Sequence, residues 1–296
     1  MTVTPPDAAR RCAVLGAPIE HSLSPLLHRT AYAQLGLDWT YTAHEVTEQA
    51  LPAFLADLDP SWRGLSLTMP LKRAVLPLLD EVEPVARTVE AVNTVLLSPG
   101  HRSGANTDVS GLLTALRTAM SSIGEKQPVG HAIVIGAGAT AASALAALAG
   151  LGVDTVDLRV REVARAHRTL LIGDRLGLEV RVLPLDAPWQ SAPWAVSSVP
   201  SGGAVVVSTI PSAVAAEVLP ENVLSGTVVA DVRYDPWPSP LLAVAERRGS
   251  ATVTGIDVLV HQAVAQVRLM TGREVDADAL LEAGEAAVRR RATLPP

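Results

Sequence analysis

Short hydrophobic runs alternate with stretches of helical periodicity along nearly the whole chain. Each run has the length of one buried strand, and each helical stretch is long enough to return the chain to the start of the next strand. This alternation is typical of an α/β protein with a mainly parallel sheet. In the first part of the chain the pattern predicts strands at 12–16, 40–46, 64–67 and 92–97.

The second part of the chain repeats the pattern up to a short run at 251–255. Two helical stretches, 257–271 and 275–291, then follow with no further strand. Because these helices have no sheet of their own to cover, we expect them to pack on the first domain. We therefore predict a discontinuous first domain, 1–109 plus 256–296, and a second domain, 110–255. The strands predicted for the second domain are 132–135, 155–160, 179–184, 204–208 and 227–231.

Two local details of the first domain are also predicted. Ser24 is placed as the N-cap of a helix, with Pro25 in its first turn and Gly36 as its stop. The polar stretch 98–108 is expected to form a turn, which leads into a helix over 109–121.

Composition narrows the class of protein. The 296 residues are 48% hydrophobic and 18% charged, which is ample for two buried cores. We expect a cytoplasmic protein with no membrane partner, because no apolar run reaches the roughly 18–20 residues of a spanning helix and no signal peptide is recognisable. A net charge of −6 with scattered arginines argues against nucleic acid as a partner. The single Cys12 and the scattered histidines indicate neither a disulfide framework nor a metal site.

A glycine-containing turn follows the first strand of the second domain. Gly136, Ala137, Gly138 and Ala139 lie between a hydrophobic strand and a helix, and Ala141 completes a G-x-G-x-x-A arrangement. The glycines of such a turn allow a pyrophosphate to approach the backbone at the N-terminus of the helix. The turn therefore predicts a Rossmann domain that binds NAD(P).

The next strand bears on the choice between NADP and NAD. Asp157 has about the spacing of a ribose-binding acid, but it lies in mid-strand and should point away from the cofactor. Arg161 is at the end of the strand, where a guanidinium can bind a 2′-phosphate. Glu162 beside it could instead accept a ribose hydroxyl. NADP is the favoured cofactor, and NAD is left open.

Polar side chains gather in the predicted loops of the first domain. Only two of the 24 basic residues are lysines, and one of them, Lys72, lies in such a loop. Unlike arginine, whose pKa stays above about 12, lysine can exchange a proton in catalysis. One ammonium, one carboxylate, hydroxyls and an amide suit a small polyhydroxylated carboxylic acid. The members of these clusters are Ser22, Ser24, Ser66, Thr68, Lys72, Asn93, Asn106 and Asp108.

The motifs, taken together, resemble those of the shikimate dehydrogenase family. "HSLSPLLH", "GLSLTMPLK", "EAVNT" and "GANTDVSGL" resemble its substrate motifs, and "GAGATAASAL" resembles its cofactor loop. "DVRYDPWPSPLL" and "TGIDVLVHQAVAQVRLMTG" are similar to its later motifs, so the resemblance runs over nearly the whole chain. It implies an N-terminal substrate domain completed by the last helices, a Rossmann domain, and an active site in the cleft between them.

The resemblance also implies an activity and a set of site residues. The reaction is the reversible NADPH-dependent reduction of 3-dehydroshikimate to shikimate, in the pathway to chorismate and the aromatic amino acids. Lys72 and Asp108 would be the catalytic pair, with Asp108 either exchanging a proton or orienting Lys72. Tyr234 and Gly255 would lie near the nicotinamide, where Tyr234 also lines the substrate site. The substrate would be bound by Ser22, Ser24, Thr68, Asn93 and Gln262.

The chain departs from the family pattern in three places, and alternatives stay open. Ser66 replaces a common asparagine, and "VRE" at 160–162 occupies the place of the family's Asn-Arg-Thr motif. The stretch "VSTIPS" leaves Ser208 and Thr209 as candidates beside the cofactor. The alternatives are a quinate or aminoshikimate dehydrogenase that uses NAD, a methylenetetrahydrofolate dehydrogenase, and a catalytically silent sensor. The chain is expected to be a monomer or a homodimer.

Overall fold

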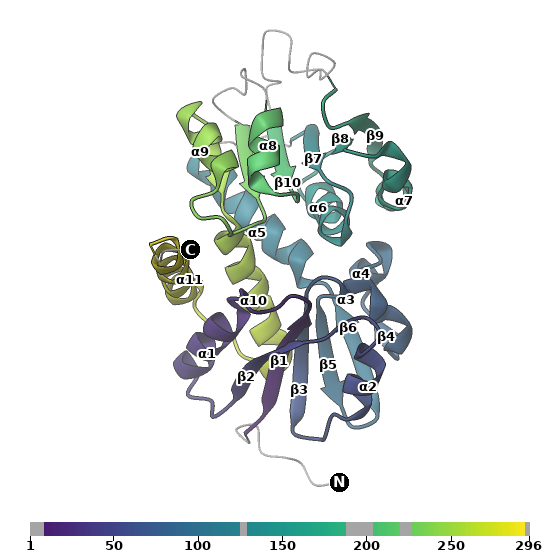
Figure 1. Cartoon of the computed structure of the whole chain (residues 1–296), viewed down its shortest axis with the longest axis vertical. Helices are drawn as coiled ribbons and strands as arrows, with labels where there is room; N and C mark the ends of the chain where they lie inside the picture. Colours follow the sequence, from purple (N-terminus) through teal and green to yellow (C-terminus); the bar gives the residue numbers. More distant parts are fainter. Residues whose placement is uncertain (1–8, 125–128, 188–203, 220–226, 294–296) are drawn as a thin grey trace. The chain divides into compact units, whose positions relative to one another are not determined.

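A computed structural model describes residues 9–124, 129–187, 204–219 and 227–293, and the chain divides into two compact units (Figure 1). Unit 1 comprises Met1–Thr107 and Gln262–Ala287, and unit 2 comprises Asp108–His261 and Val288–Pro296. Unit 1 is thus assembled from two stretches that are far apart in the sequence. The chain passes between the units near residues 107, 261 and 287, compared with the predicted boundaries at 109 and 255.

Unit 1 contains a six-stranded sheet in the order β2-β1-β3-β5-β6-β4. The first three strands are parallel, whereas β5 runs antiparallel to both β3 and β6. The prediction of a turn over 98–108 is therefore wrong, because β6 lies within it. Its first residues are polar and only partly buried, so this strand leaves no hydrophobic run in the sequence. The strands are β1 (Arg11–Gly16), β2 (Thr40–Glu45), β3 (Trp62–Leu67), β4 (Glu81–Val82), β5 (Thr94–Ser98) and β6 (His101–Ala105).

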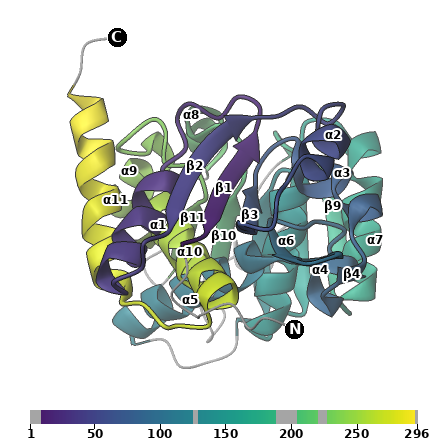
Figure 2. The same cartoon turned by 90° about the horizontal axis from the view of Figure 1, so that it is seen from below.

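Helices cover both faces of this sheet. Ala13 and Leu15 of β1 face a core that includes residues of α2 and α3. The opposite face is covered by α1 and by the C-terminal part of α10, whose Met270 packs where a side chain at Gly64 would lie (Figure 2). The helices are α1 (Ser24–Gln34), α2 (Leu51–Ala56), α3 (Leu71–Ala74), the 3-10 turn η1 (Leu76–Leu78), α4 (Pro84–Thr88), α10 (Gly255–Thr271) and α11 (Ala277–Ala292).

Helix α1 differs from its prediction at the N-terminus. Ser24 is its first residue, and the capping position belongs to Leu23, which makes no side-chain cap. The placement of Ser24 as N-cap is therefore wrong. Pro25 lies in the first turn as predicted, and Gly36, with φ +64°, follows the helix end in the left-handed conformation that favours glycine.

Unit 2 contains a fully parallel sheet in the order β12-β11-β10-β7-β8-β9. From β7 the later strands are added first on one side of the sheet and then on the other, so the strand order reverses between β7 and β10. Open α/β sheets bind ligands at the carboxyl ends of the strands beside such a reversal. The strands are β7 (His131–Ile135), β8 (Thr155–Val160), β9 (Glu179–Pro184), β10 (Ala204–Ser208), β11 (Thr227–Asp231) and β12 (Ala251–Val253). The helices are α5 (Thr107–Ser122), α6 (Ala139–Gly150), η2 (Val163–Ala166), α7 (His167–Arg175), α8 (Ser212–Val218) and α9 (Pro240–Arg247).

Within the described ranges, every helix is too short or too polar to pass through a lipid bilayer.

Candidate substrate and cofactor sites

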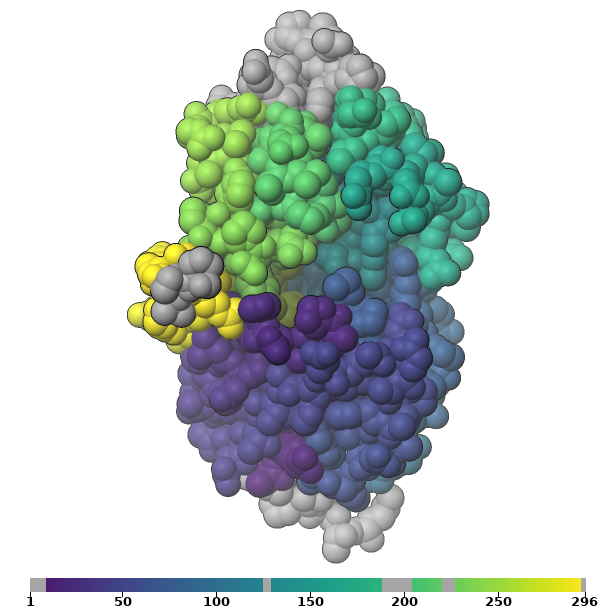
Figure 3. Space-filling view, in the orientation of Figure 1, coloured from purple at the N-terminus to yellow at the C-terminus, as the bar shows by residue number. Residues whose placement is uncertain are grey.

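The loops that follow β1 and β3 meet at the carboxyl end of the unit 1 sheet. The amide of Ala17 donates to the carbonyl of Met69 at 3.0 Å, and the amide of Thr68 donates to that of Leu15 at 2.9 Å. A side chain at Gly16 would overlap the methyl group of Thr68, so the close approach requires glycine there. The purple residues that follow β1 reach the surface of unit 1 (Figure 3). The contact brings the loop before α1 and Thr68 to the same sheet edge.

Ser22 and Ser24 lie in the loop and first turn that lead into α1. The hydroxyl of Ser22 accepts a hydrogen bond from the amide of Ser24 at 3.3 Å. One turn later, Nδ1 of His28 donates to the carbonyl of Ser24 at 2.9 Å. The His28 ring is fully buried and stacks on Tyr41 with 3.9 Å between ring centroids. His28 therefore anchors the predicted substrate loop to the sheet.

Burial gives His28 a pH dependence. Loss of solvation lowers its pKa from 6.5 to about 4, against the opposing effect of its bond to Ser24. A lowered histidine pKa means that the neutral ring contributes stability above pH 6.5, which is lost as pH falls towards 4. Between pH 7.5 and 5 this loss amounts to about 2 kcal/mol of unfolding free energy. In His28→Phe, which keeps an aromatic stack, we expect this component to be absent.

Urea unfolding of both proteins at pH 7.5 and pH 5 measures the difference, since all other titrating groups are shared. Equal pH dependence in the wild type and His28→Phe would contradict the assignment of the neutral ring.

Tyr41 continues the buried chain of contacts. Its hydroxyl donates to Oγ of Ser66 at 2.6 Å, and Ser66 in turn donates to Oε1 of Gln266 at 2.9 Å. Nε2 of Gln266 donates to Oγ1 of Thr94 at 3.0 Å. Ser66 is only 3% exposed, so its hydroxyl is committed to the interior of unit 1. The serine that replaces the family's asparagine therefore joins α10 to the sheet.

Asn93 is the centre of this network and has no exposed surface. Its Oδ1 accepts from the amide of Thr107 at 2.7 Å and from the hydroxyl of Thr94 at 2.9 Å. Its Nδ2 donates to Oγ1 of Thr107 and to Oε1 of Gln262, both at 2.9 Å. Asn93 thus binds the start of α5 and the middle of α10 to the end of the sheet, and both of its amide hydrogens are used within the protein.

Five residues of this network were missed in the sequence: His28, Tyr41, Thr94, Thr107 and Gln266. One signal was available, since Gln262 and Gln266 are spaced i, i+4 and so share a helix face. Ser24, Ser66, Asn93 and Gln262 were predicted, and all four are joined by the network.

Lys72 lies in α3, directly after the loop that contains Thr68. Its carbonyl accepts from the amide of Val92 at 2.8 Å, and the neighbouring carbonyl of Asn93 accepts from Leu67 at 2.8 Å. The backbone of Lys72 is therefore fixed beside the Asn93 segment, and its side chain is half-buried. Asp108 lies in the first turn of α5, next in sequence to Thr107. The two belong to different units, and their pairing stays a prediction.

The glycine turn of unit 2 has the conformation that its sequence predicts. Gly136 has φ +112°, and a side chain there would overlap Oγ1 of Thr209. Thr209 is itself fixed by bonds from its amide and hydroxyl to the carbonyl of Ile135, each 2.9 Å. A side chain at Gly138 would meet no protein atom within 4 Å, and α6 begins directly after it without a side-chain cap. This open approach to the amides of a helix N-terminus fits a pyrophosphate.

A cavity of about 290 Å³ adjoins this turn. Arg161 and Glu162, the candidates at the strand end, line it together with Arg165, whose Nε lies 2.8 Å from a carboxylate oxygen of Glu162. The two arginines suit a ribose 2′-phosphate, which guanidinium groups bind in bidentate fashion. The lining consists of Gly136, Ala137, Arg159, Val160, Arg161, Glu162, Arg165, Leu185, Ile210, Pro211 and Val214.

Asp157 points away from this cavity, as its mid-strand position predicts. It is 1% exposed and forms an ion pair with Arg181 at 2.8 Å. Nε2 of His131 lies 3.4 Å from the other carboxylate oxygen of Asp157. Arg165 and the buried Arg159 were missed in the sequence, although Arg165 follows Glu162 at the i, i+3 spacing of one helical turn. Ser208 is fully buried in β10 and does not line the cavity, whereas Ile210 does.

Gly255 has a packing role that the sequence does not reveal. A Cβ atom there would lie 2.5 Å from the carbonyl carbon of Arg233 and 2.8 Å from the amide nitrogen of Tyr234. Glycine therefore lets the start of α10 pack against the segment that carries Tyr234. Any contact of either residue with a nicotinamide stays a prediction.

In the described ranges no group of three or more His, Cys, Asp or Glu side chains is placed to hold a metal ion.

The chain matches known proteins in sequence over nearly its whole length. A profile described as "Shikimate dehydrogenase substrate binding domain" matches residues 14–95, and "Shikimate 5'-dehydrogenase C-terminal domain" matches residues 255–283. A shikimate dehydrogenase (NADP(+)) of Thermus thermophilus is 37% identical over 278 residues, which cover 94% of this chain and 98% of the relative. The chain belongs to the shikimate dehydrogenase family. The Moorella thermoacetica enzyme is 35% identical and 88% of each chain is covered.

Solved structures of the family have the same fold. The Mycobacterium tuberculosis shikimate dehydrogenase matches with a TM-score of 0.79 and 36% identity, over 94% of this chain and 99% of that one. The shikimate 5-dehydrogenase of a second Thermus thermophilus strain, in complex with NADP(H) and shikimate, matches with a TM-score of 0.77 and 33% identity, over 94% and 99%. The resemblance inferred from the motifs and the α/β class are confirmed.

Proposed function

We propose that this protein is a shikimate dehydrogenase, which reduces 3-dehydroshikimate to shikimate reversibly with NADPH. The observation that carries the proposal is the buried network in unit 1, which fixes Ser24, Asn93 and Gln262 relative to one another. Membership of the family over nearly the whole chain supports it, and a solved relative holds shikimate and NADP(H). In this proposal 1–109 plus 256–296 is the substrate domain, and 110–255 is the cofactor domain.

The substrate is a carboxylate with several hydroxyl groups, and unit 1 offers matching partners. Ser22, Ser24 and Thr68 of unit 1 supply hydroxyls at the loops beyond β1 and β3, and Tyr234, which belongs to unit 2, supplies a phenol. Gln262 is 8% exposed, and its Oε1 is held by Asn93. We assign these side chains as contacts of the substrate. We assign Asn93 as the residue that positions Gln262.

NADPH, when bound, supplies the hydride that reduces the carbonyl. The amides of 136–139 would hold its pyrophosphate at the start of α6. Arg161 and Arg165 would hold the 2′-phosphate, and Gly255 would adjoin the nicotinamide.

Lys72 is assigned as the proton donor. When the carbonyl is reduced, negative charge develops on its oxygen, and an ammonium beside it stabilises this charge and donates the proton. In the oxidation direction the neutral amine accepts the proton. Asp108 is assigned as the partner that orients Lys72 and a substrate hydroxyl.

Arg161→Ala should raise the KM for NADPH about 10- to 100-fold, because a charge-assisted hydrogen bond to the 2′-phosphate is lost. The KM for NADH, which lacks this phosphate, should hardly change, so NADH serves as the control in the same protein. Glu162→Gln should act in the opposite direction and lower the KM for NADPH, since it removes a carboxylate from the phosphate site and releases Arg165. Initial rates with both cofactors measure these effects. An equal loss for NADPH and NADH in Arg161→Ala would contradict the phosphate assignment.

The activity is tested by rates at 340 nm with shikimate and with quinate, each with NADP and NAD. We expect the highest kcat/KM for shikimate with NADP. A preference for quinate with NAD would instead support the paralogue reading. Absence of turnover with every combination of substrate and cofactor would contradict the proposed activity and favour a catalytically silent sensor.

A further inference from the structure

A second cavity lies in unit 1, at the end of the sheet opposite to the predicted substrate residues. It has a volume of about 780 Å³, within the usual range for small-molecule sites. Trp62 and Arg63 line it at the start of β3, whereas Thr68 follows the other end of that strand. The length of β3 separates the two sites by about 17 Å. The cavity is therefore distinct from the proposed active site.

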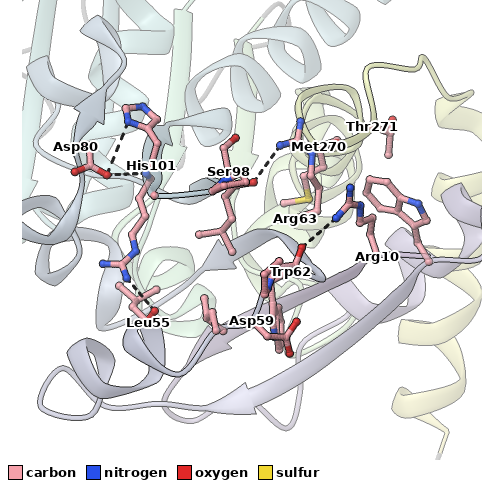
Figure 4. Close-up of a pocket in the computed structure, with 17 residues that line it drawn as sticks. Arg10, Leu55, Asp59, Trp62, Arg63, Asp80, Ser98, His101, Met270 and Thr271 are labelled. Atoms are coloured by element: carbon pink, nitrogen blue, oxygen red, sulfur yellow. Dashed lines mark hydrogen bonds and ion pairs between the residues drawn. The ribbon is translucent and has the colours of Figure 1, made fainter. Parts of the chain in front are cut away.

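Three arginine side chains line this cavity, and main-chain carbonyl groups orient them. Arg10 donates to Pro60 at 3.0 Å, and Arg102 donates to Leu55 at 3.0 Å. Arg63 donates from Nε to the carbonyl of Met270 at 2.9 Å and from Nη1 to that of Leu97 at 3.2 Å. Arg10 and Arg63 lie near Met270 and Thr271 (Figure 4). Carbonyl groups fix a guanidinium without neutralising its charge, and none of the three forms an ion pair with a carboxylate in the described ranges.

The two carboxylates that line the cavity already have partners. Asp59 forms an ion pair with Arg11 at 3.2 Å and accepts from the amide of Ser61 at 2.7 Å. Asp80 accepts from the backbone amide of Arg102 at 2.7 Å, with His101 at 3.9 Å. With three arginines and two aspartates, the formal charge of the lining is +1 when His101 is neutral. This charge matches a ligand with a single negative charge.

Most of the remaining lining is apolar or aromatic, with Ser98, His101 and Thr271 as polar members. Trp62 is only 7% exposed, and its ring already carries the guanidinium of Arg11 at 4.4 Å from the centroid, so the partly exposed Trp39 is the ring open to a ligand. Four aliphatic or thioether side chains lie around the two rings. Flat apolar ligands stack favourably on such rings. The four are Leu55, Leu58, Leu97 and Met270.

We propose that this cavity binds an aromatic monocarboxylate, with the carboxylate on Arg10 and Arg63 and the ring against Trp39. Guanidinium groups that are already oriented lose little freedom on binding, and their fork matches a carboxylate. Binding at this cavity does not depend on the proposed dehydrogenase activity, because the residues that line the cavity lie at the other end of the sheet.

The test is titration calorimetry with naphthalene-2-carboxylate, with 2-naphthalenemethanol as the uncharged analogue and 2-naphthyl phosphate as the dianion. We expect saturable binding of the carboxylate, with at least roughly tenfold weaker binding of both analogues. Arg10→Gln should weaken carboxylate binding about tenfold or more. Arg10 is half-buried and makes one side-chain bond to a carbonyl, so the variant should fold. Arg29→Gln is the matched control, since Arg29 also binds only a carbonyl group, that of Pro25, but lies outside the cavity.

A second experiment separates this cavity from the substrate site, which also takes a carboxylate. The titration is repeated with saturating shikimate, and binding to the cavity should persist unchanged. Displacement by shikimate, equal affinity in Arg10→Gln and the wild type, or absence of binding would each overturn the proposal. Tighter binding of the phosphate would overturn the assignment of a singly charged ligand. If the protein had no dehydrogenase activity, the binding measurements would still decide whether the cavity takes an aromatic carboxylate.

Discussion

Lys72→Ala should lower turnover of shikimate by roughly 10²–10⁴, the usual contribution of one acid–base group. The KM for shikimate should change much less, because the assigned substrate contacts come from other residues. Lys72→Arg should not restore turnover, since a guanidinium keeps the charge but does not exchange its proton at neutral pH. The kcat for oxidation of shikimate, measured at saturating NADP, checks both variants.

Asp108→Asn and the double variant test whether the two residues act together. Residues that act as a unit lose most of their effect with the first substitution, so the double variant should be little slower than Lys72→Ala. Unfolding curves that match the wild type would show that the loss is chemical. Near-normal turnover of Lys72→Ala would remove Lys72 from the mechanism.

Strands β7, β8, β10 and β11 of unit 2 could be predicted because they are buried along nearly their whole length. In a parallel sheet that is covered on both faces, a strand such as β10 or β11 is buried throughout and reads as a hydrophobic run. Strand β6 could not be found in this way. It is held by hydrogen bonds to β5 and β4, but its first three residues, His101, Arg102 and Ser103, are only partly buried or exposed. Backbone pairing in a sheet does not require apolar side chains, so a strand such as β6 produces no hydrophobic pattern in the sequence.

The candidate sites show a similar division. The glycine turn is local, and its meaning follows from a strand before it and a helix after it. The buried network depends instead on partners that are distant in sequence, such as Ser66 with Gln266 and Asn93 with Gln262, which are 200 and 169 positions apart. No periodicity relates such positions. A resemblance can indicate that Asn93 and Gln262 belong to one site, but only the structure reveals that Asn93 uses its amide to hold Gln262.

This changes what substitution of Asn93 is expected to do. If Asn93 only contacted substrate, Asn93→Ala would raise KM and leave the fold intact. The structure predicts a loss of about 3 kcal/mol or more of unfolding free energy, because the buried amide of Thr107 loses its acceptor and the side chain of Gln262 loses its donor. The KM for shikimate should rise as well, since Gln262 is no longer held. Urea unfolding at pH 7.5 and steady-state rates on the same preparation measure the two effects.

Asn106→Ala provides the matched comparison. Asn106 is also buried, at 4% exposed, and its side chain donates to the carbonyl of Ala91 at 2.8 Å, outside the network. We expect it to lose about 1 kcal/mol with little change in KM, because Gln262 keeps its donor. A destabilisation of Asn93→Ala no larger than that of Asn106→Ala would mean that the network does not hold unit 1 together. A large destabilisation with unchanged KM would mean that Gln262 is structural and that the substrate is bound elsewhere along the loops beyond β1 and β3.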